Sequence, residues 1–530
     1  MARKRQRSIA KAAQAMAVDG QAPAGAMMTW GFGTGTPGTS RMANSDRFGH
    51  WRPMVADADG YAQFELKDLR AFSRDLERTA PIATGAIETK TSYVIGAGLT
   101  LQSRVDTEEL GLSTEAASAW QRRTERRFSV WASDKRCSTN RRQDFYDLQD
   151  LAYRGRLVSG DAFVLLADTQ RAGWPFRLAL QVIEADRVCN ENNAMNTATL
   201  VDGIQYDEAT GEPKSAWIAA HHPGRILPGA RQSWTEVPFY GPSGRCNLIQ
   251  VSRILRPGQT RGIPDLGPII ATVKQLDRYS NAEVDAAVNS AALALFAQMD
   301  AEAFRDVFTD PGDQAAYIKK AAEWDGTINS GKAINLFPGE SITAPTPGRP
   351  NPNYDPFFNS FLSLVGMGLN IPKEVLQKAF NSSYSASRAA LMDAWRTFKI
   401  ERSRFARQFC QVIYQEWLAD AVALGLIDAP GFFGDLFVRA AWCGAQWSGD
   451  GPGALDPKQE AEAAEVRMRS GVTTLAKETV AYDGSDWEDN HRQRAEEVRR
   501  RRADDIEAPM VEPGALSDDE DDEDDEETDP

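Results

Sequence analysis

Two carboxylates, Glu184 and Asp186, are the residues of this chain whose spacing best fits general acid and base chemistry. Residues two apart on a strand point to the same face, so the pair could approach the separation that a two-carboxylate glycosidase needs. An acid pair at the end of a strand is far more often solvated, or paired with a nearby cation such as Arg187. We therefore expect a solvated edge or an ion pair here, and no enzymatic activity.

Other patterns that could bind a cofactor or a metal are incomplete. The segment GTGTPG at 33–38 fits G-x-G-x-x-G, but it lacks the preceding strand, the following helix and the later acidic residue of a dinucleotide site. Thr39 stands where a P-loop would need lysine. His221 and His222 adjoin a strand end, where neighbouring side chains point in opposite directions, so they predict no shared metal site. We expect no cofactor and no metal.

The charge of the chain is concentrated at one end. The formal net charge is −15, and 518–529 holds 11 acidic residues in 12 positions, so the remainder carries −15 + 11 = −4. Such a block repels itself and predicts a disordered tail, which serves either for solubility or for docking to a basic surface. Four consecutive cations, Arg499 to Arg502, lie near the end of an expected helix, where the helix dipole favours them. They are either a solvated helix end or a contact for phosphate or for the acidic tail.

The cysteines and the apolar runs indicate a soluble protein of a reducing compartment. Five cysteines are scattered without a C-x-x-C pair, which predicts reduced and mostly buried thiols. Lys11 and Gln14 interrupt what would be the apolar core of a signal peptide. The longest apolar run, 286–299, is shorter than the roughly 20 residues that span a bilayer, so we expect no membrane segment.

Stepping outward from these residues, hydrophobic periodicity predicts a mixed α and β chain. Glycine, threonine and proline dominate 1–60, and we expect weak order before Leu66. The expected elements are helices around a break at Pro81, a helix over 113–132, a helix from about 144, strands at 161–168 and 176–188, a hairpin over 203–218 with ATGEP as its turn, a long helix over 263–297, strand-like character in 331–345, and two helices after residue 456.

The segment 351–418 reads as an apolar helix, a polar loop and a long amphipathic helix. The loop contains Lys373 and Lys378 together with small polar side chains that could contact phosphates without holding them. These small polar residues are Asn381, Ser382, Ser383, Ser385 and Ser387. On the residues alone, the loop is either an ordinary solvent loop or a weak contact for nucleic acid.

Several segments in consistent order resemble tailed-bacteriophage portal proteins, most closely the lambda type. The resemblance is carried by SGDAFVLLAD (159–168), LQVIEADRV (180–188), GIQYDEATGEPKSAWI (203–218), RPGQTRGIPDLGPII (256–270), NIPKEVL (370–376) and SSYSASRAALMDAWR (382–396), and it covers about 60–505. It implies an α+β subunit that assembles as a ring, usually of about twelve copies, at one vertex of the capsid.

The resemblance also implies a division of the subunit into parts. These are a flexible arm (1–60), an α/β wing (61–262), a stem helix (263–297), a small α/β clip (298–350), a second stem helix (351–370), a tunnel loop (371–387), a long wing helix (388–428), a helical crown (429–505) and a disordered acidic tail (506–530). The tunnel loop would then bring Lys373, Lys378, Asn381, Ser382, Ser383 and Ser385 to the DNA channel.

The function that the resemblance implies is a channel through which double-stranded DNA is packaged and ejected. Its partners would be other copies of the chain, the terminase large subunit, the major capsid protein, head-completion or adaptor proteins, scaffold and loosely held duplex DNA. A mildly acidic body with few loop cations suits a conduit, because affinity rises with each phosphate neutralised. The alternative is another minor capsid or head-tail adaptor protein without a DNA channel.

Overall fold

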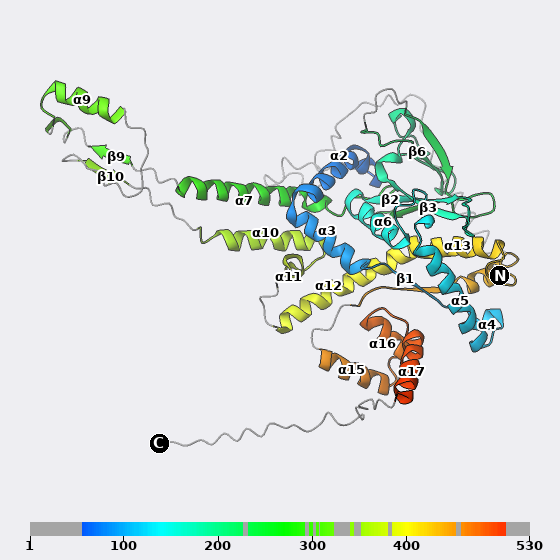
Figure 1. Cartoon of the computed structure of the whole chain (residues 1–530). Coiled ribbons are helices and arrows are strands. Elements are labelled where there is room, and N and C mark those ends of the chain that lie inside the picture. The colour runs from blue at the N-terminus through cyan, green and yellow to red at the C-terminus, as the bar shows by residue number, and fades with distance from the viewer. Residues whose placement is uncertain are drawn as a thin grey trace, which may run out of the picture.

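The structure, a computed structural model, describes residues 56–225, 232–291, 296–299, 304–306, 308–322, 340–343, 351–379, 384–451 and 457–504. Most of the expected arm and all of the expected C-terminal tail, 506–530, lie outside this part of the chain. Figure 1 shows a mixed helical and β body, a pair of helices that projects from it to a small distal unit, and a separate group of C-terminal helices. None of the described helices is long and apolar enough to cross a membrane.

Two helices joined at a proline open the described chain. α2 (Ala58–Thr79) and α3 (Pro81–Val94) meet at Ala80, and Pro81 takes the first helical position, where its missing N–H costs nothing. The break expected at Pro81 is therefore confirmed. α2 begins before Leu66, earlier than expected, because the Asp57 side chain caps it by accepting a hydrogen bond from the Gly60 N–H at 2.7 Å.

A three-stranded antiparallel sheet forms the centre of the body. Its strands are β2 (Asp161–Asp168), β3 (Leu178–Glu184) and β8 (Leu248–Ser252), in the order β3-β2-β8. The expected strand over 161–168 is confirmed at both ends, whereas the strand expected over 176–188 ends at Glu184 and continues as a 3-10 turn, Ala185–Arg187. α6 (Phe145–Ser159) precedes β2 and packs on the sheet.

The expected hairpin belongs to a second sheet of four antiparallel strands. In order these are β4 (Leu200–Val201), β5 (Ile204–Tyr206), β6 (Pro213–Ala219) and β7 (Trp234–Pro238). The turn between β5 and β6 closes because Asp207 Oδ1 accepts hydrogen bonds from the N–H groups of Ala209 and Thr210, at 2.9 and 3.0 Å. The hairpin over 203–218 is therefore confirmed.

A nearly continuous helix crosses the body and supplies much of its core. It comprises α12 (Tyr384–Phe405), a π-helical turn (Ala406–Cys410) and α13 (Gln411–Ala423). Phe398, Phe409 and Trp417 on this helix are fully buried, and they pack with Phe128 of α5 (Thr114–Ala132) and with α6. The helix expected over 113–132 is confirmed, with Ser113 as its cap.

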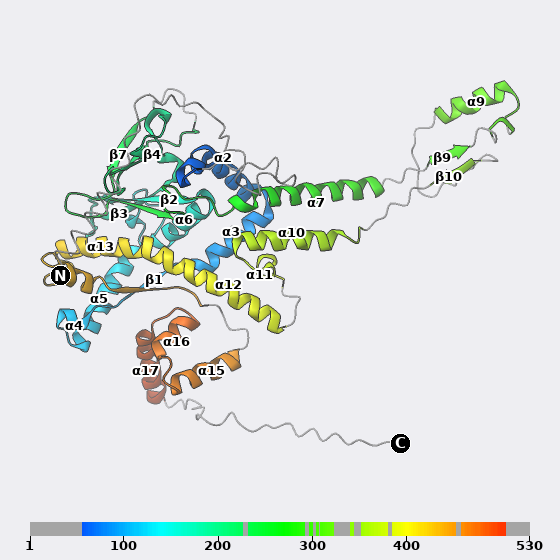
Figure 2. The same ribbon diagram turned by 180° about the vertical axis from the view of Figure 1, so that it is seen from behind.

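The projecting pair consists of α7 (Ile270–Ala291) and α10 (Tyr354–Leu369), which lie side by side in Figures 1 and 2. Tyr279 stacks on Tyr354 and Phe357, with ring centroids 5.8 and 4.3 Å apart, and fixes their packing. The helix expected from 263 begins as a 3-10 turn at Gly267 and becomes α-helical only at Ile270. Pro264 and Pro268 explain the late start, because neither can donate a backbone hydrogen bond.

A small unit lies at the far end of this pair. β9 (Phe296–Met299) and β10 (Glu340–Thr343) form an antiparallel ladder, and α9 (Pro311–Ala322) lies beside it (Figure 1). The strand-like character expected in 331–345 is observed at 340–343, and the rest of that segment lies outside the described residues.

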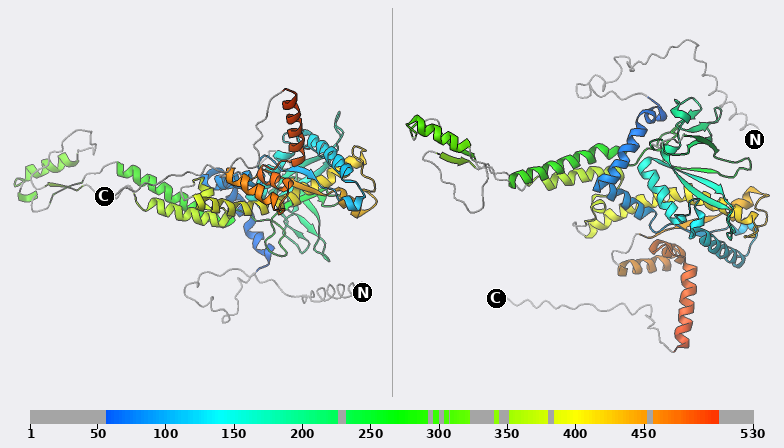
Figure 3. Two further views of the ribbon diagram at one scale, coloured as in Figure 1. Left: turned by 90° about the horizontal axis from the view of Figure 1, so that it is seen from below. Right: turned by 45° about the horizontal axis from the view of Figure 1, so that its top comes forward.

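The C-terminal region divides differently from the expected crown over 429–505. α14 (Leu436–Trp442) packs on α4 (Thr107–Leu110), and β11 (Ala445–Ser448) pairs with β1 (Thr100–Ser103), so 436–448 belongs to the body. Only α15 (Pro457–Arg469), α16 (Leu475–Tyr482) and α17 (Trp487–Ala503) form a separate group, seen from two sides in Figure 3. These three helices contain no buried residue. α16 is an addition to the two helices expected there.

Candidate DNA-channel segment and the ion pairs that support it

A tight turn carries the chain from α10 into the expected tunnel loop. Asn370 adopts a left-handed conformation (φ 55°) and ends the helix, and the Ile371 N–H donates to the Gly366 carbonyl at 2.9 Å. A Cβ on Gly366 would stand 2.5 Å from the Ile371 carbonyl oxygen, so only glycine allows this close approach. The start of the loop is thereby fixed to the end of α10.

The first predicted lysine lies on a short helix rather than in an open loop. α11 (Lys373–Gln377) packs on α3 and α12 through Val375, which is buried. Lys373 is half-buried at its first position, and Lys378 is exposed at its end with φ 53°. The Gln377 amide donates to the Asn359 side-chain oxygen of α10 at 3.1 Å. Both lysines are therefore held on an anchored element.

The remaining predicted site residues are divided between the described and the undescribed parts of the chain. Asn381, Ser382 and Ser383 lie outside the described residues. Ser385 is exposed in the first turn of α12, and Ser387 is buried. The expected loop over 371–387 is thus shorter than predicted, because α11 occupies its first half and α12 starts at Tyr384. Sequence reading missed α11 because five residues are too few for a hydrophobic period.

A buried network of charges ties α12, which follows this segment, to the body and to the start of α7. Lys90 of α3 donates to Asp265 Oδ2 at 2.8 Å and to Glu401 Oε1 at 3.3 Å. Arg156 of α6 contacts the same two carboxylates, and the Tyr153 hydroxyl donates to Glu401 Oε2 at 2.5 Å. Asp265 precedes α7 and Glu401 lies on α12, so the network joins the start of the projecting pair to the long helix.

The network keeps its carboxylate ionised in a dry environment. Burial alone would raise the pKa of Glu401, but Lys90 and Arg156 outweigh burial and lower its pKa to about 2. Burial, followed by the nearby Glu401 charge, raises the pKa of Tyr153, which therefore stays a hydrogen-bond donor. The arrangement holds together the helices that carry these side chains.

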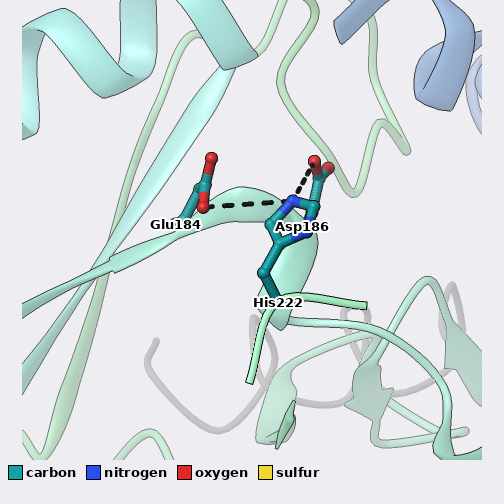
Figure 4. A group of neighbouring side chains, drawn as sticks. All are labelled: Glu184, Asp186 and His222. Carbon is teal, nitrogen blue, oxygen red and sulfur yellow. Dashed lines mark hydrogen bonds and ion pairs between the residues drawn. The ribbon is translucent and has the colours of Figure 1, made fainter. Parts of the chain in front are cut away.

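A second cluster contains the acid pair considered above. Glu184, Asp186 and His222 converge at the end of β3, with His222 Nε2 3.2 Å from an Asp186 oxygen and 3.9 Å from a Glu184 oxygen (Figure 4). Among the described residues this is the one group of three side chains whose geometry could hold a metal ion. Arg74 pairs with both carboxylates, and Arg70 pairs with Asp186 at 3.3 Å.

The two arginines make this cluster an ion-pair network rather than a metal centre. Burial would raise the pKa of Asp186, but Arg70 and Arg74 lower it below its usual range. A cation entering the cluster would face two guanidinium groups already at the oxygens it needs. The expectation of an ion pair is confirmed, but the cation is not Arg187, whose Nε donates to the Ala219 carbonyl at 2.9 Å.

A neighbouring carboxylate extends the same network into the sheet. Asp161, fully buried, accepts from Arg261 Nε at 2.6 Å and from Arg70 at 3.1 Å. Arg261 also donates to the carbonyls of Val188, Ala185 and Asp202. Arg70, Arg261 and Asp161 were not predicted, and their one sequence signal is a charged residue beside an apolar run.

A cleft of about 600 Å³ lies between α4, α5 and α14. Its walls are largely apolar, and Trp120 and Trp442 stack there with centroids 4.6 Å apart. The charged groups on it are Glu109, Arg123 and Asp428, and its lining holds no serine, cysteine, lysine or histidine. The cleft could receive an apolar side chain but offers no arrangement for covalent chemistry.

The described residues thus form a body from which α10, α11 and α12 carry the candidate segment on anchored elements. Residues 44–402 match the family described as phage portal protein, lambda family, and the chain belongs to that family. Portal protein B of Escherichia phage lambda is 24% identical over 478 residues, covering 87% of this chain and 88% of that protein. The portal protein of Escherichia phage N15 is 25% identical over 479 residues, covering 87% and 89%.

Two further similarities were found. A probable portal protein of Halomonas phage phiHAP-1 is 23% identical over 473 residues, covering 87% of this chain and 86% of that protein. Among solved structures, a chain from the neck of an empty gene transfer agent particle, computed with C6 symmetry, has a TM-score of 0.44 and 12% identity, covering 78% of this chain and 94% of that one.

Proposed function

We propose that this chain assembles into a ring at one capsid vertex and forms the channel through which double-stranded DNA is packaged and ejected. Membership of the lambda family of phage portal proteins is the observation that carries the proposal. In this role the chain is a structural component of the virion and not an enzyme.

The projecting helices support assembly with further copies. Val284 and Val288, one turn apart on α7, are 61% and 65% exposed, and Met367 on α10 is 70% exposed. Apolar side chains at helical spacing on a projecting element are usually covered by a partner. In a closed ring, this surface of each subunit would contact a different surface of the next subunit, which is a heterologous contact.

The anchored turn after α10 supports a channel-facing role for the predicted lysines. Lys378 is exposed, Lys373 is half-exposed, and both lie on a short helix tied to α3, α10 and α12. Two cations per subunit give weak attraction to phosphate, whereas a continuous basic groove would hold the duplex. Asn381, Ser382, Ser383 and Ser385 would add hydrogen bonds that form and break as DNA moves.

The other parts of the subunit would meet the remaining partners. The distal unit of α9, β9 and β10 would be the clip that docks the terminase motor and later the head-completion proteins. The body would be the wing, next to the major capsid protein and scaffold, and α15 to α17 would be the crown. The boundary of the crown then falls after Ser448, because β11 pairs with β1.

Electron microscopy of the purified chain tests this function. End-on views should show a ring of roughly twelve copies with a central hole close to the width of a DNA duplex. A ring without such a hole, or a monomer that attaches only to assembled capsids, would favour a head-tail adaptor instead.

The channel assignment has a test of its own. Lys373→Gln with Lys378→Gln should alter DNA packaging or retention in assembled particles, while ring formation stays normal. The matched control is Lys274→Gln with Lys399→Gln, two exposed lysines on α7 and α12. If packaging and retention match the parent, or if the control has the same effect, the two lysines do not contact DNA.

A further inference from the structure

The last turn of α17 carries the densest positive charge on the described chain. Arg499, Arg500, Arg501 and Arg502 are consecutive, and all four are exposed. Consecutive helical residues are about 100° apart, so four of them spread charge around the whole helix end. The cluster is therefore a cationic cap on the helix and not a stripe on one face.

Most of this charge has no carboxylate partner among the described residues. Arg500 pairs with Glu496 at 2.5 Å, one turn earlier. Arg499 donates through Nε to the Ala495 carbonyl at 3.2 Å, which leaves its charge uncompensated. The described residues place no carboxylate within ion-pair distance of Arg501 or Arg502. The partial negative charge of the helix end compensates only part of a cluster this dense.

An anionic segment of matching size follows in the same chain. Residues 518–529 contain 11 acidic side chains, and 13 residues, 505–517, separate them from the end of the described chain at Asp504. A random coil of 13 residues would have a root-mean-square span of roughly 20 Å. The four arginines lie within five residues of Asp504, so a connection of this span leaves the acidic segment within reach of them. Such tethering gives an effective concentration in the millimolar range.

We propose that the acidic segment 518–529 binds the arginine cap, Arg499 to Arg502, and competes there with other polyanions. Guanidinium groups form bidentate ion pairs with carboxylates, and the binding free energies of several weak pairs add along the segment. Exposed pairs of this kind are individually worth less than about 1 kcal/mol, so the contact forms and opens readily. It is a shield that a stronger polyanion displaces.

The consequence for DNA rests on the proposed function. In a ring, the arginine caps of all subunits would gather at the crown, where phosphates of the duplex would otherwise bind them and slow its passage. The tail would occupy the arginines while DNA moves and would yield to phosphate when local DNA density becomes high. The target of the tail is thus the arginine cap, and the competing ligand is duplex phosphate.

Binding of a synthetic peptide tests the contact without DNA. A fluorescent peptide of residues 514–530 is titrated, near 50 mM salt, into the full chain with its tail neutralised by Asp→Asn and Glu→Gln over 518–529. We expect saturable binding that weakens strongly towards 200 mM salt. Arg501→Gln with Arg502→Gln should weaken it about three- to tenfold.

The matched control removes the same formal charge from the N-terminal half of the helix. Arg492→Gln with Arg494→Gln should change peptide binding less than twofold, and circular dichroism should show equal helix content in both variants. Equal losses in the two variants would mean attraction to the net charge of α17 and would overturn the proposal. Absence of binding at 50 mM salt would overturn it as well.

DNA binding tests the competition. Neutralising the tail should raise the affinity of the chain for a short duplex about tenfold near 50 mM salt, and Arg501→Gln with Arg502→Gln should remove that gain. A gain that persists in the arginine variant would show that the tail repels DNA only through long-range charge, contrary to the proposal. The peptide result does not depend on ring formation, so failure of the proposed function would be seen separately by microscopy.

Discussion

Lys90 is the cation on which the packing of α3, α12 and the start of α7 converges. Its side chain is 2% exposed, and its partners Asp265 and Glu401 lie 175 and 311 residues away. A buried ion pair adds little net stability when complete, but removing one partner strands the other charge. Two carboxylates that are distant in sequence therefore compensate this lysine, and loss of either one should lower the free energy of unfolding substantially.

Glu401→Gln should accordingly lower the free energy of unfolding by about 3–5 kcal/mol. The amide still accepts a hydrogen bond from Tyr153, but it no longer compensates Lys90 and Arg156. Urea unfolding followed by circular dichroism measures the loss. Glu88→Gln is the control, because Glu88 is half-exposed and pairs with Arg154 at 2.6 Å, so its loss should cost less than about 1 kcal/mol. Equal effects of the two changes would contradict a buried network.

Glu125 predicts how stability depends on pH. It accepts a hydrogen bond from the Ser103 N–H at 2.7 Å, and burial, reinforced by Asp486 and Glu488, raises its pKa from 4.5 to about 7. The folded chain therefore binds this proton more tightly than the unfolded chain, so Glu125 adds stability as pH falls from about 7 to about 4.5. Above pH 7 its ionised form is destabilising.

Glu125→Gln should remove that slope and stabilise the chain at pH 8 by roughly 1–2 kcal/mol, after allowance for partial exposure. Thermal and urea unfolding of parent and variant between pH 5 and 8 measure the difference. Asp486→Asn should give a smaller change in the same direction, because it removes only one of the causes. A variant less stable than the parent at pH 8 would contradict the raised pKa.

The elements with local signals could be predicted from the sequence. The run DAFVLLAD lies between Gly160 and a polar turn, and its strand has the predicted ends. α5 and the β5–β6 hairpin carry their own cap and turn residues, Ser113 and Asp207. α11 was not predicted, because five residues are too few to show a hydrophobic period. The late start of α7 was not predicted either, because the 3-10 turn before it has the same apolar spacing as an α-helix.

The side-chain networks were beyond sequence reading. The helices that carry Lys90, Arg156 and Glu401 were predicted, but their side chains meet only after the chain has folded. The acid pair Glu184 and Asp186 was expected to be either solvated or paired with a nearby cation such as Arg187. The ion pair is observed, but its cations are Arg70 and Arg74, which lie more than 100 residues away in sequence. Local sequence patterns predict helices and strands, whereas the ion-pair partners of buried side chains can be identified only from the folded structure.

The exposed valines of α7 are expected to lie between subunits. Val284→Asp with Val288→Asp should convert rings into monomers, because each interface would bury two charges without partners, at several kcal/mol. Analytical ultracentrifugation measures the shift, and circular dichroism should show the fold retained. Val130→Asp on α5 is the control, since Val130 is equally exposed but lies away from the pair. Rings that survive the double change, or that are lost with the control, would contradict this interface.

At the scale of the whole molecule, the distal unit is separable from the body. The β9–β10 ladder is formed by two strands that pair with each other, and the described residues of α9, β9 and β10 make no substantial packing with the body. Hydrogen bonds join α7 to the residues that precede α10, since the Asn351 amide donates to the Tyr279 hydroxyl and to a Glu283 carboxylate oxygen, at 3.3 and 2.9 Å. Among the described residues, the unit therefore has no packed interface with the body.

Replacing residues 289–350 with a six-residue glycine-serine turn should therefore leave the body folded. The turn has only to span the end of α7 and Asn351, and six residues reach roughly 20 Å. Thermal unfolding of the body should be unchanged within a few degrees, and rings should still form, because Val284, Val288 and Met367 remain. Under the proposed function, DNA packaging should be lost, since the motor would have no docking surface. A shortened chain that packages DNA normally would refute the clip assignment, and one that no longer forms rings would show that subunits contact each other through the distal unit.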